Sequence, residues 1–123
     1  MKKQNYQQEI GPGLMAISAT SLLMAAYRMY KDYLSKAARS CDTMEGRDKT
    51  LCMTKYKMEG TRAQMEKLRK SLSKCQEAKY PQKCQERLQE KISKLRDKYK
   101  KLEKKFNMVY NLAKQAEKER SSK

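Results

Sequence analysis

One segment decides how this chain folds, namely residues 84–116, CQERLQEKISKLRDKYKKLEKKFNMVYNLAKQA. Its apolar residues follow one another at alternating steps of four and three, which is the spacing of a coiled-coil seam. They are Leu88, Ile92, Leu95, Tyr99, Leu102, Phe106, Val109, Ala113 and Ala116. Most residues between them are polar or charged, so the helix is stable only when a partner covers this stripe.

Residues 49–76 supply a matching partner. Their apolar residues recur every seven positions, and the heptad phase is the same before and after Gly60, which indicates a helix that continues through this glycine. These residues are Leu51, Met58, Met65 and Leu72. Asp48 or Thr50 is expected to cap the start of the helix.

The two helices are expected to fold back on each other at Pro81, because proline is tolerated in the first turn of a helix and unfavourable inside one. Antiparallel pairing then matches Leu72 with Leu88 and, at the far end, Leu51 with Val109, and it places Gly60 beside Tyr99. The predicted fold class is therefore all-α, with a long antiparallel coiled-coil hairpin over residues 49–118 and a frayed tail over residues 119–123.

The N-terminal part of the chain has a different character. Residues 1–12 form a polar arm, and an apolar-to-amphipathic helix is predicted over residues 13–40, after Gly11-Pro12-Gly13. No residue between 10 and 27 is charged, so this stretch must be buried. Burial against other protein is favoured because small residues suit close helix packing, whereas a marginal membrane span and a peripheral membrane helix remain alternatives. A cleaved secretory signal is disfavoured because Glu9 interrupts the basic leader.

We expect this first helix to be the element that joins the protein to an assembly. The residues assigned to that role are Leu14, Ile17, Leu22, Leu23 and Met24.

Four cysteines flank the two predicted turns. Cys41 and Cys52 flank the first turn, and Cys75 and Cys84 flank the second, so each pair is predicted to form a disulfide across its turn. The nested pairing would require Cys52 to reach Cys75 along one continuous helix, a distance of about 34 Å. Four free buried thiols and a four-cysteine zinc site are the remaining alternatives. Disulfides would imply a particle or compartment exposed to an oxidising environment.

The chain is strongly basic, with 30 Lys and Arg against 14 Asp and Glu and a net charge of +16. Six of these cations repeat at steps of four and three on α-helical positions beside the seam, and we call this stripe the basic ridge. It consists of Arg87, Lys91, Lys94, Lys98, Lys101 and Lys105. The ridge has no matching row of acidic residues, since its neighbours on the second helix include Gln64 and Ser71, and it is expected to face solvent and contact phosphates. On the other flank, Glu103 is expected to pair with Lys55 or Arg62.

Catalysis has little support in this sequence. It contains no histidine, no glycine-rich phosphate loop and no serine elbow, so we expect no catalytic residue, no metal site and no cofactor. The predicted function is a non-enzymatic structural subunit of a large assembly, such as a virion, whose partners are other protein subunits and nucleic acid bound without sequence specificity. A stand-alone nucleic-acid-binding protein and a single-span accessory subunit of an organellar membrane complex are the alternatives, and a membrane is the less favoured partner.

Overall fold

The computed structural model describes residues 17–121, which form three α-helices and one short 3-10 helix. The helices are α1 (Ala19–Ser40), α2 (Gly46–Ser71) and α3 (Pro81–Ser121), with the 3-10 helix η2 (Leu72–Glu77) between the last two. The β-structure in this range is a single isolated bridge between Ile17 and Ala78. The predicted all-helical class is confirmed, whereas the polar arm and Leu14 lie outside the described residues.

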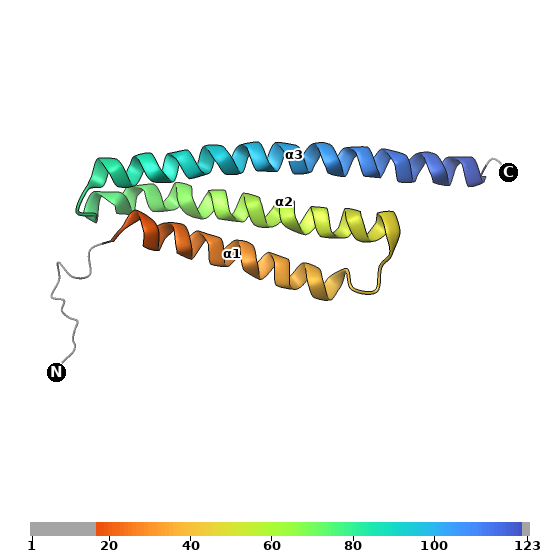
Figure 1. The fold of residues 1–123 in the computed structure, drawn as a ribbon, viewed down its shortest axis with the longest axis horizontal. Coiled ribbons are helices and arrows are strands. Elements are labelled where there is room, and N and C mark those ends of the chain that lie inside the picture. Colours follow the sequence, from red (N-terminus) through yellow and green to blue (C-terminus); the bar gives the residue numbers. More distant parts are fainter. Residues whose placement is uncertain (1–16, 122–123) are drawn as a thin grey trace.

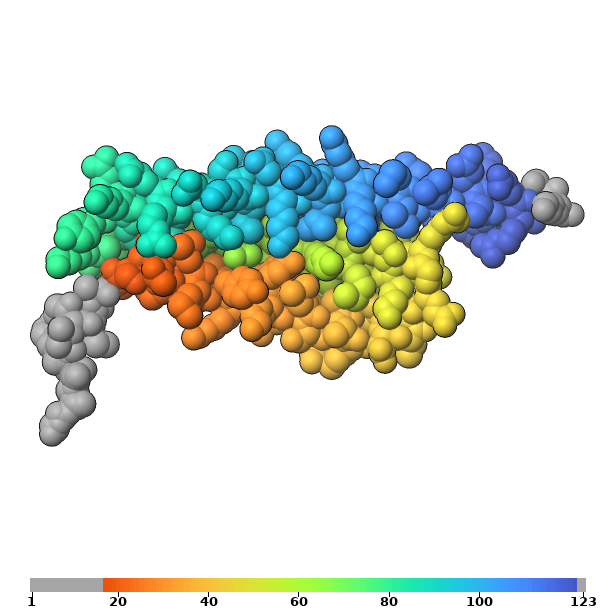
Figure 2. All heavy atoms as spheres, in the orientation of Figure 1, coloured from red at the N-terminus to blue at the C-terminus, as the bar shows by residue number. Residues whose placement is uncertain are grey.

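The three helices lie side by side, and each runs opposite to the one before it (Figure 1). α1 packs mainly on α2 and makes a smaller interface with α3. The space-filling view in Figure 2 shows α3 extending beyond the rest of the molecule at its C-terminal end. The first helix therefore folds back on the chain's own hairpin, a question that the sequence left open.

α1 begins later than the expected residue 13 because Ser18 caps it. The Ser18 hydroxyl accepts a hydrogen bond from the Ser21 backbone amide at 3.1 Å, and the Ser21 hydroxyl lies 3.3 Å from the Ser18 amide. This reciprocal arrangement satisfies two of the amides that a helix start leaves without partners. Ile17 consequently lies outside the helix.

The expected caps of α2 are wrong. The N-cap residue is Glu45, which makes no side-chain cap hydrogen bond, and Gly46 follows with a φ of +59°, a conformation that glycine adopts without steric cost. The Thr50 hydroxyl instead donates to the Gly46 carbonyl at 3.3 Å. The prediction of a helix that runs through Gly60 is confirmed.

The regular α-helix ends at Ser71, earlier than residue 76, and η2 tightens the chain into the turn before α3. Pro81 occupies the first residue of α3, as predicted. α3 then continues to Ser121, so residues 119–121, expected to fray, are helical.

The core lies at the end of the molecule where all three helices meet. It combines small residues of α1 with larger apolar residues of α2 and α3 and both cysteines of the second turn. Its members are Ala19, Leu22, Ala26, Met65, Leu68, Cys75, Cys84, Leu88, Ile92 and Leu95. Leu51, Leu102, Phe106 and Val109, toward the other end of the predicted seam, are only half-buried.

Gly60 packs against α1, and its predicted position beside Tyr99 is wrong. A Cβ atom built at Gly60 would lie 2.9 Å from Tyr33 Cβ and 3.0 Å from Tyr30 Cδ1. The absence of a side chain at Gly60 therefore lets α1 approach α2 closely.

Both predicted disulfides are present. Cys41 bonds to Cys52 and links α1 to α2, and Cys75 bonds to Cys84 and links the turn at η2 to α3, with Cα–Cα distances of 5.8 Å and 5.5 Å. Because disulfides form and persist where thiols are not kept reduced, they indicate an oxidising environment for this protein. Among residues 17–121, we find no helical stretch with the length and apolar character needed to span a bilayer.

Candidate polyanion-binding face

The basic ridge does not lie entirely in solvent, which corrects the sequence-based expectation. Arg87 donates from Nη1 to the Thr20 hydroxyl of α1 at 3.3 Å, and Lys91 and Lys98 are half-buried. Lys94 and Lys101 are exposed. The ridge thus has an inner row that faces the other helices and an outer row that faces water, because α1 packs beside α3.

The closest approach of the ridge to an aromatic ring is made by Lys98. Its Nζ atom lies 4.0 Å from the centre of the Tyr30 ring, and Tyr30 is only 7% exposed. An ammonium group over a ring face is stabilised by about 0.5 to 2 kcal/mol, depending on desolvation. This contact holds Lys98 where α1 and α3 meet, and no carboxylate of residues 17–121 pairs with its charge.

Lys91 and Lys105 lie one heptad before and after Lys98, and each lines a surface hollow. We call the first the tyrosine hollow, which holds about 280 Å³. It is lined by Thr20, Leu23, Met24, Tyr27, Gln64 and Lys91. Its apolar wall comes from α1, and its charge comes from α3.

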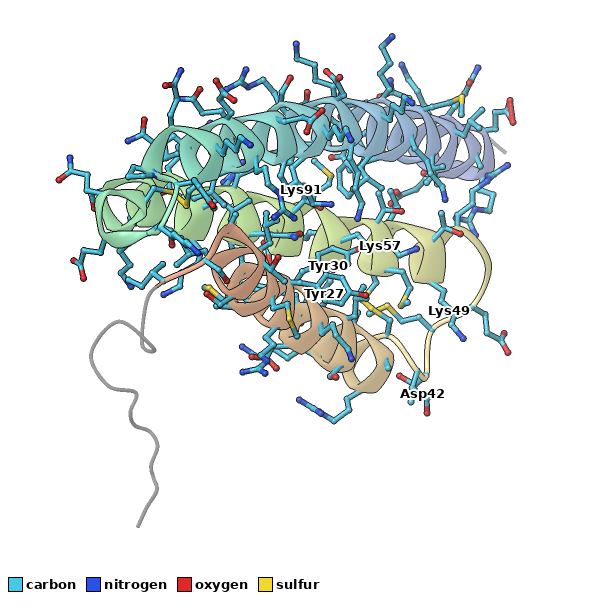
Figure 3. All side chains as sticks on the ribbon, turned by 60° about the vertical axis from the view of Figure 1, so that its left-hand side comes forward. Tyr27, Tyr30, Asp42, Lys49, Lys57 and Lys91 are labelled. Atoms are coloured by element: carbon cyan, nitrogen blue, oxygen red, sulfur yellow. A yellow bond between two sulfur atoms is a disulfide. The ribbon has the colours of Figure 1, made fainter. Side chains whose placement is uncertain are left out.

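The second is the lysine hollow, which holds about 240 Å³ between the N-terminal half of α2 and the middle of α3. It is lined by Gly46, Lys49, Thr50, Met53, Thr54, Lys57 and Lys105. Figure 3 labels Lys91 on α3 and Lys57 and Lys49 along α2, in succession toward the loop that carries Asp42. Neither hollow is lined by an acidic residue.

Within the part of the chain that the structure describes, none of the six ridge residues forms an ion pair with a carboxylate. The face that joins the ridge to the two hollows therefore carries positive charge contributed by α2 as well as α3. Such a face attracts anions, and its field is screened over about 8 Å at physiological salt.

The opposite flank of the hairpin differs from its expected pairing. Arg62 donates from Nη2 to the Tyr99 hydroxyl at 2.6 Å, and its guanidinium carbon lies 5.4 Å from the Tyr99 ring centre. The expected ion pair between Glu103 and Arg62 or Lys55 is not formed, since Arg62 is held on Tyr99 instead.

The sequence reasoning missed the residues that α2 contributes to this face, especially Lys49, Lys57 and Thr54. Gln64 was correctly placed on the ridge side of α2, because it shares the tyrosine hollow with Lys91. A usable signal was present: Gly46, Thr50, Lys57 and Gln64 recur along one side of α2 at helical spacing.

No family model matches the chain, and comparisons with curated proteins and with solved structures also find no match. Residues 17–121 contain no cluster of three or more side chains suited to metal ligation. The surface of the protein is therefore the main indication of its function.

Proposed function

We propose that this protein is a non-enzymatic structural subunit of a large assembly and that its basic face binds a polyanion. The observation that carries the proposal is the run of ridge and α2 lysines on one face, with no carboxylate among the residues that line its hollows. A virion that meets an oxidising exterior is one host that accommodates both the disulfides and the charge.

Nucleic acid is the favoured partner, because repeated cations on a stiff helix suit the phosphate backbone. From Arg87 to Lys105 the ridge extends about 27 Å at 1.5 Å per residue. Contacts of this kind release counterions and position the partner without reading its bases. Seam aromatics such as Tyr99 and Phe106 are half-buried, which argues against stacking on single-stranded bases. An acidic protein surface is the second candidate, supported by the same charge.

The test is duplex DNA binding measured at several salt concentrations. The test variant replaces Lys91, Lys94, Lys98 and Lys101 with Gln. The charge-matched control replaces Lys70, Lys74, Lys100 and Lys118, which are exposed elsewhere. The slope of log K against log salt should fall by up to about 0.9 per lost phosphate contact in the test variant only.

Two results would contradict the proposal. The wild-type protein could fail to bind duplex DNA near physiological salt, or the two variants could show equal slopes. In either case the basic ridge is a solvated helix face.

The proposed role of α1 in assembly is kept, but with a different set of contact residues. Leu22 is buried in the chain's own core, so it is not available to a partner, whereas Met24 is 54% and Tyr27 50% exposed. Met108 and Leu112 of α3 are also exposed, at 60% and 46%. We propose that these outward apolar side chains make the contacts with other subunits, since large apolar residues in water favour burial at an interface.

The coiled-coil register of α2 with α3 is also part of the proposal. It is supported by a third hollow in which Met58 and Arg62 line the surface together with Tyr99 and Phe106. The register predicts that cysteines introduced at Met58 and Leu102 crosslink readily, whereas cysteines at Met58 and Lys101 do not. Equal crosslinking of the two pairs, measured on non-reducing gels, would show that the register is wrong.

A further inference from the structure

The lysine hollow has features that a general basic surface lacks. Three lysines, Lys49, Lys57 and Lys105, line one space of about 240 Å³, and they come from two different helices. All three positive charges remain without a carboxylate partner among the described residues. Bringing like charges to one place is unfavourable, and an anion bound between them removes that repulsion.

The second feature is the hydroxyl of Thr54. Thr50 and Thr61 on the same helix donate to the carbonyls four residues earlier, at 3.3 Å and 2.7 Å. Thr54 is 3% exposed and lines the hollow, yet within residues 17–121 its side chain has no hydrogen-bond partner. Buried polar groups are nearly always paired, so an unpaired hydroxyl in a cationic hollow indicates a missing acceptor.

We propose that the lysine hollow is a binding site for a phosphate group. Phosphate oxygens accept hydrogen bonds from ammonium groups and from a hydroxyl, and these are the donors that the hollow presents. A metal ion is the wrong occupant, because three ammonium groups repel it and no carboxylate is available to hold it. Of the three lysines only Lys105 belongs to the basic ridge, so the site can bind a small phosphate without the outer row of Lys94 and Lys101.

The ligand can be a free phosphate compound or a phosphate of a nucleic-acid strand, and both supply the same chemistry. The primary experiment titrates the full-length oxidised protein with inorganic pyrophosphate, followed by amide NMR shifts and calorimetry. Saturable shifts should concentrate at residues 46–57 and around Lys105. A lack of saturable binding at millimolar pyrophosphate would overturn the proposal.

Variants separate this site from diffuse attraction. Lys57→Gln should weaken pyrophosphate binding about tenfold, the scale of one charge-assisted hydrogen bond, whereas Lys70→Gln, which removes an exposed charge outside the hollow, should leave it unchanged. Thr54→Val should also weaken binding, and Thr54→Ser, which keeps the hydroxyl, should preserve it. Equal effects of Lys57→Gln and Lys70→Gln would overturn the proposal, as would full binding by a folded Thr54→Val variant.

A DNA arm identifies the source of the phosphate. If Lys57→Gln weakens both pyrophosphate and duplex DNA, the site takes a backbone phosphate, and if it weakens only pyrophosphate, the site takes a free phosphate compound. The ridge variant at Lys91, Lys94, Lys98 and Lys101 retains all three lysines of the hollow and should still bind pyrophosphate. Loss of DNA binding with retained pyrophosphate binding therefore tests the two proposals separately.

Discussion

Replacing Gly60 with alanine tests how α1 sits on α2. The substitution adds one methyl group in the middle of a helix, which by itself favours helix formation by about 1 kcal/mol. The new Cβ atom, however, would lie 2.9 Å from Tyr33 Cβ, an atom fixed directly to the α1 backbone. α1 would have to move, and crowding of this kind costs about 1 to 3 kcal/mol.

The crowding should exceed the gain in helix propensity. We therefore expect Gly60→Ala to lower the free energy of unfolding by about 1 kcal/mol, equivalent to a Tm lower by about 4 °C. Gly60→Leu should lower the free energy of unfolding much further. Circular dichroism melting of the oxidised protein measures both changes, and Glu59→Ala, at an exposed neighbouring position, serves as the control with an expected change below about 0.5 kcal/mol.

A double substitution identifies the cause. The Tyr30 ring also lies 3.0 Å from the added Cβ, so Gly60→Ala should cost less in a Tyr30→Ala background. A Tm for Gly60→Ala equal to or above the wild-type value would refute the reasoning, since it would mean that nothing packs closely against this glycine.

Two further predictions concern the disulfide between α1 and α2 and the hydrophobic core. Replacing Cys41 and Cys52 together with alanine removes the covalent link between α1 and α2 and should lower the free energy of unfolding by about 3 kcal/mol. Urea denaturation measures this change, and an unchanged midpoint would show that the disulfide does not stabilise the fold. Leu88 is fully buried, so Leu88→Ala should lower the free energy of unfolding by about 2 to 5 kcal/mol. Leu112 is exposed, so Leu112→Ala should lower it much less, and similar losses for the two variants would contradict the placement of the core.

The sequence predicted the features that depend on local spacing. The disulfide pairs follow from cysteines that flank turns, and the proline at the start of α3 follows from its fixed backbone angle. The heptad phase across Gly60 correctly predicted a continuous helix. These features need no knowledge of the third helix.

The main packing errors share one cause, namely the unknown position of α1. The apolar stretch of α1 was expected to seek another protein, yet Leu22 and Ala26 are buried against the chain's own hairpin. Gly60 was assigned to the Tyr99 layer because only two helices were considered. The small residues Ala19, Ala26 and Ala37, which lie on the buried side of α1, indicated close packing of this helix. Their spacing alone does not identify the helix against which they pack.

The same cause explains why the basic ridge was predicted but its geometry was not. Its charges follow from the helical repeat of α3, whereas the difference between Lys98 on the Tyr30 ring and the exposed Lys101 depends on α1, a helix far away in the sequence. The two hollows also differ in whether α1 contributes to them. The tyrosine hollow includes four residues of α1, and the lysine hollow includes none, so the phosphate site depends on the α2–α3 pair alone. A displacement of α1 would therefore disturb Lys91 and Lys98 before it affects Lys57 or Thr54, and the two binding activities should respond differently to any change that loosens α1.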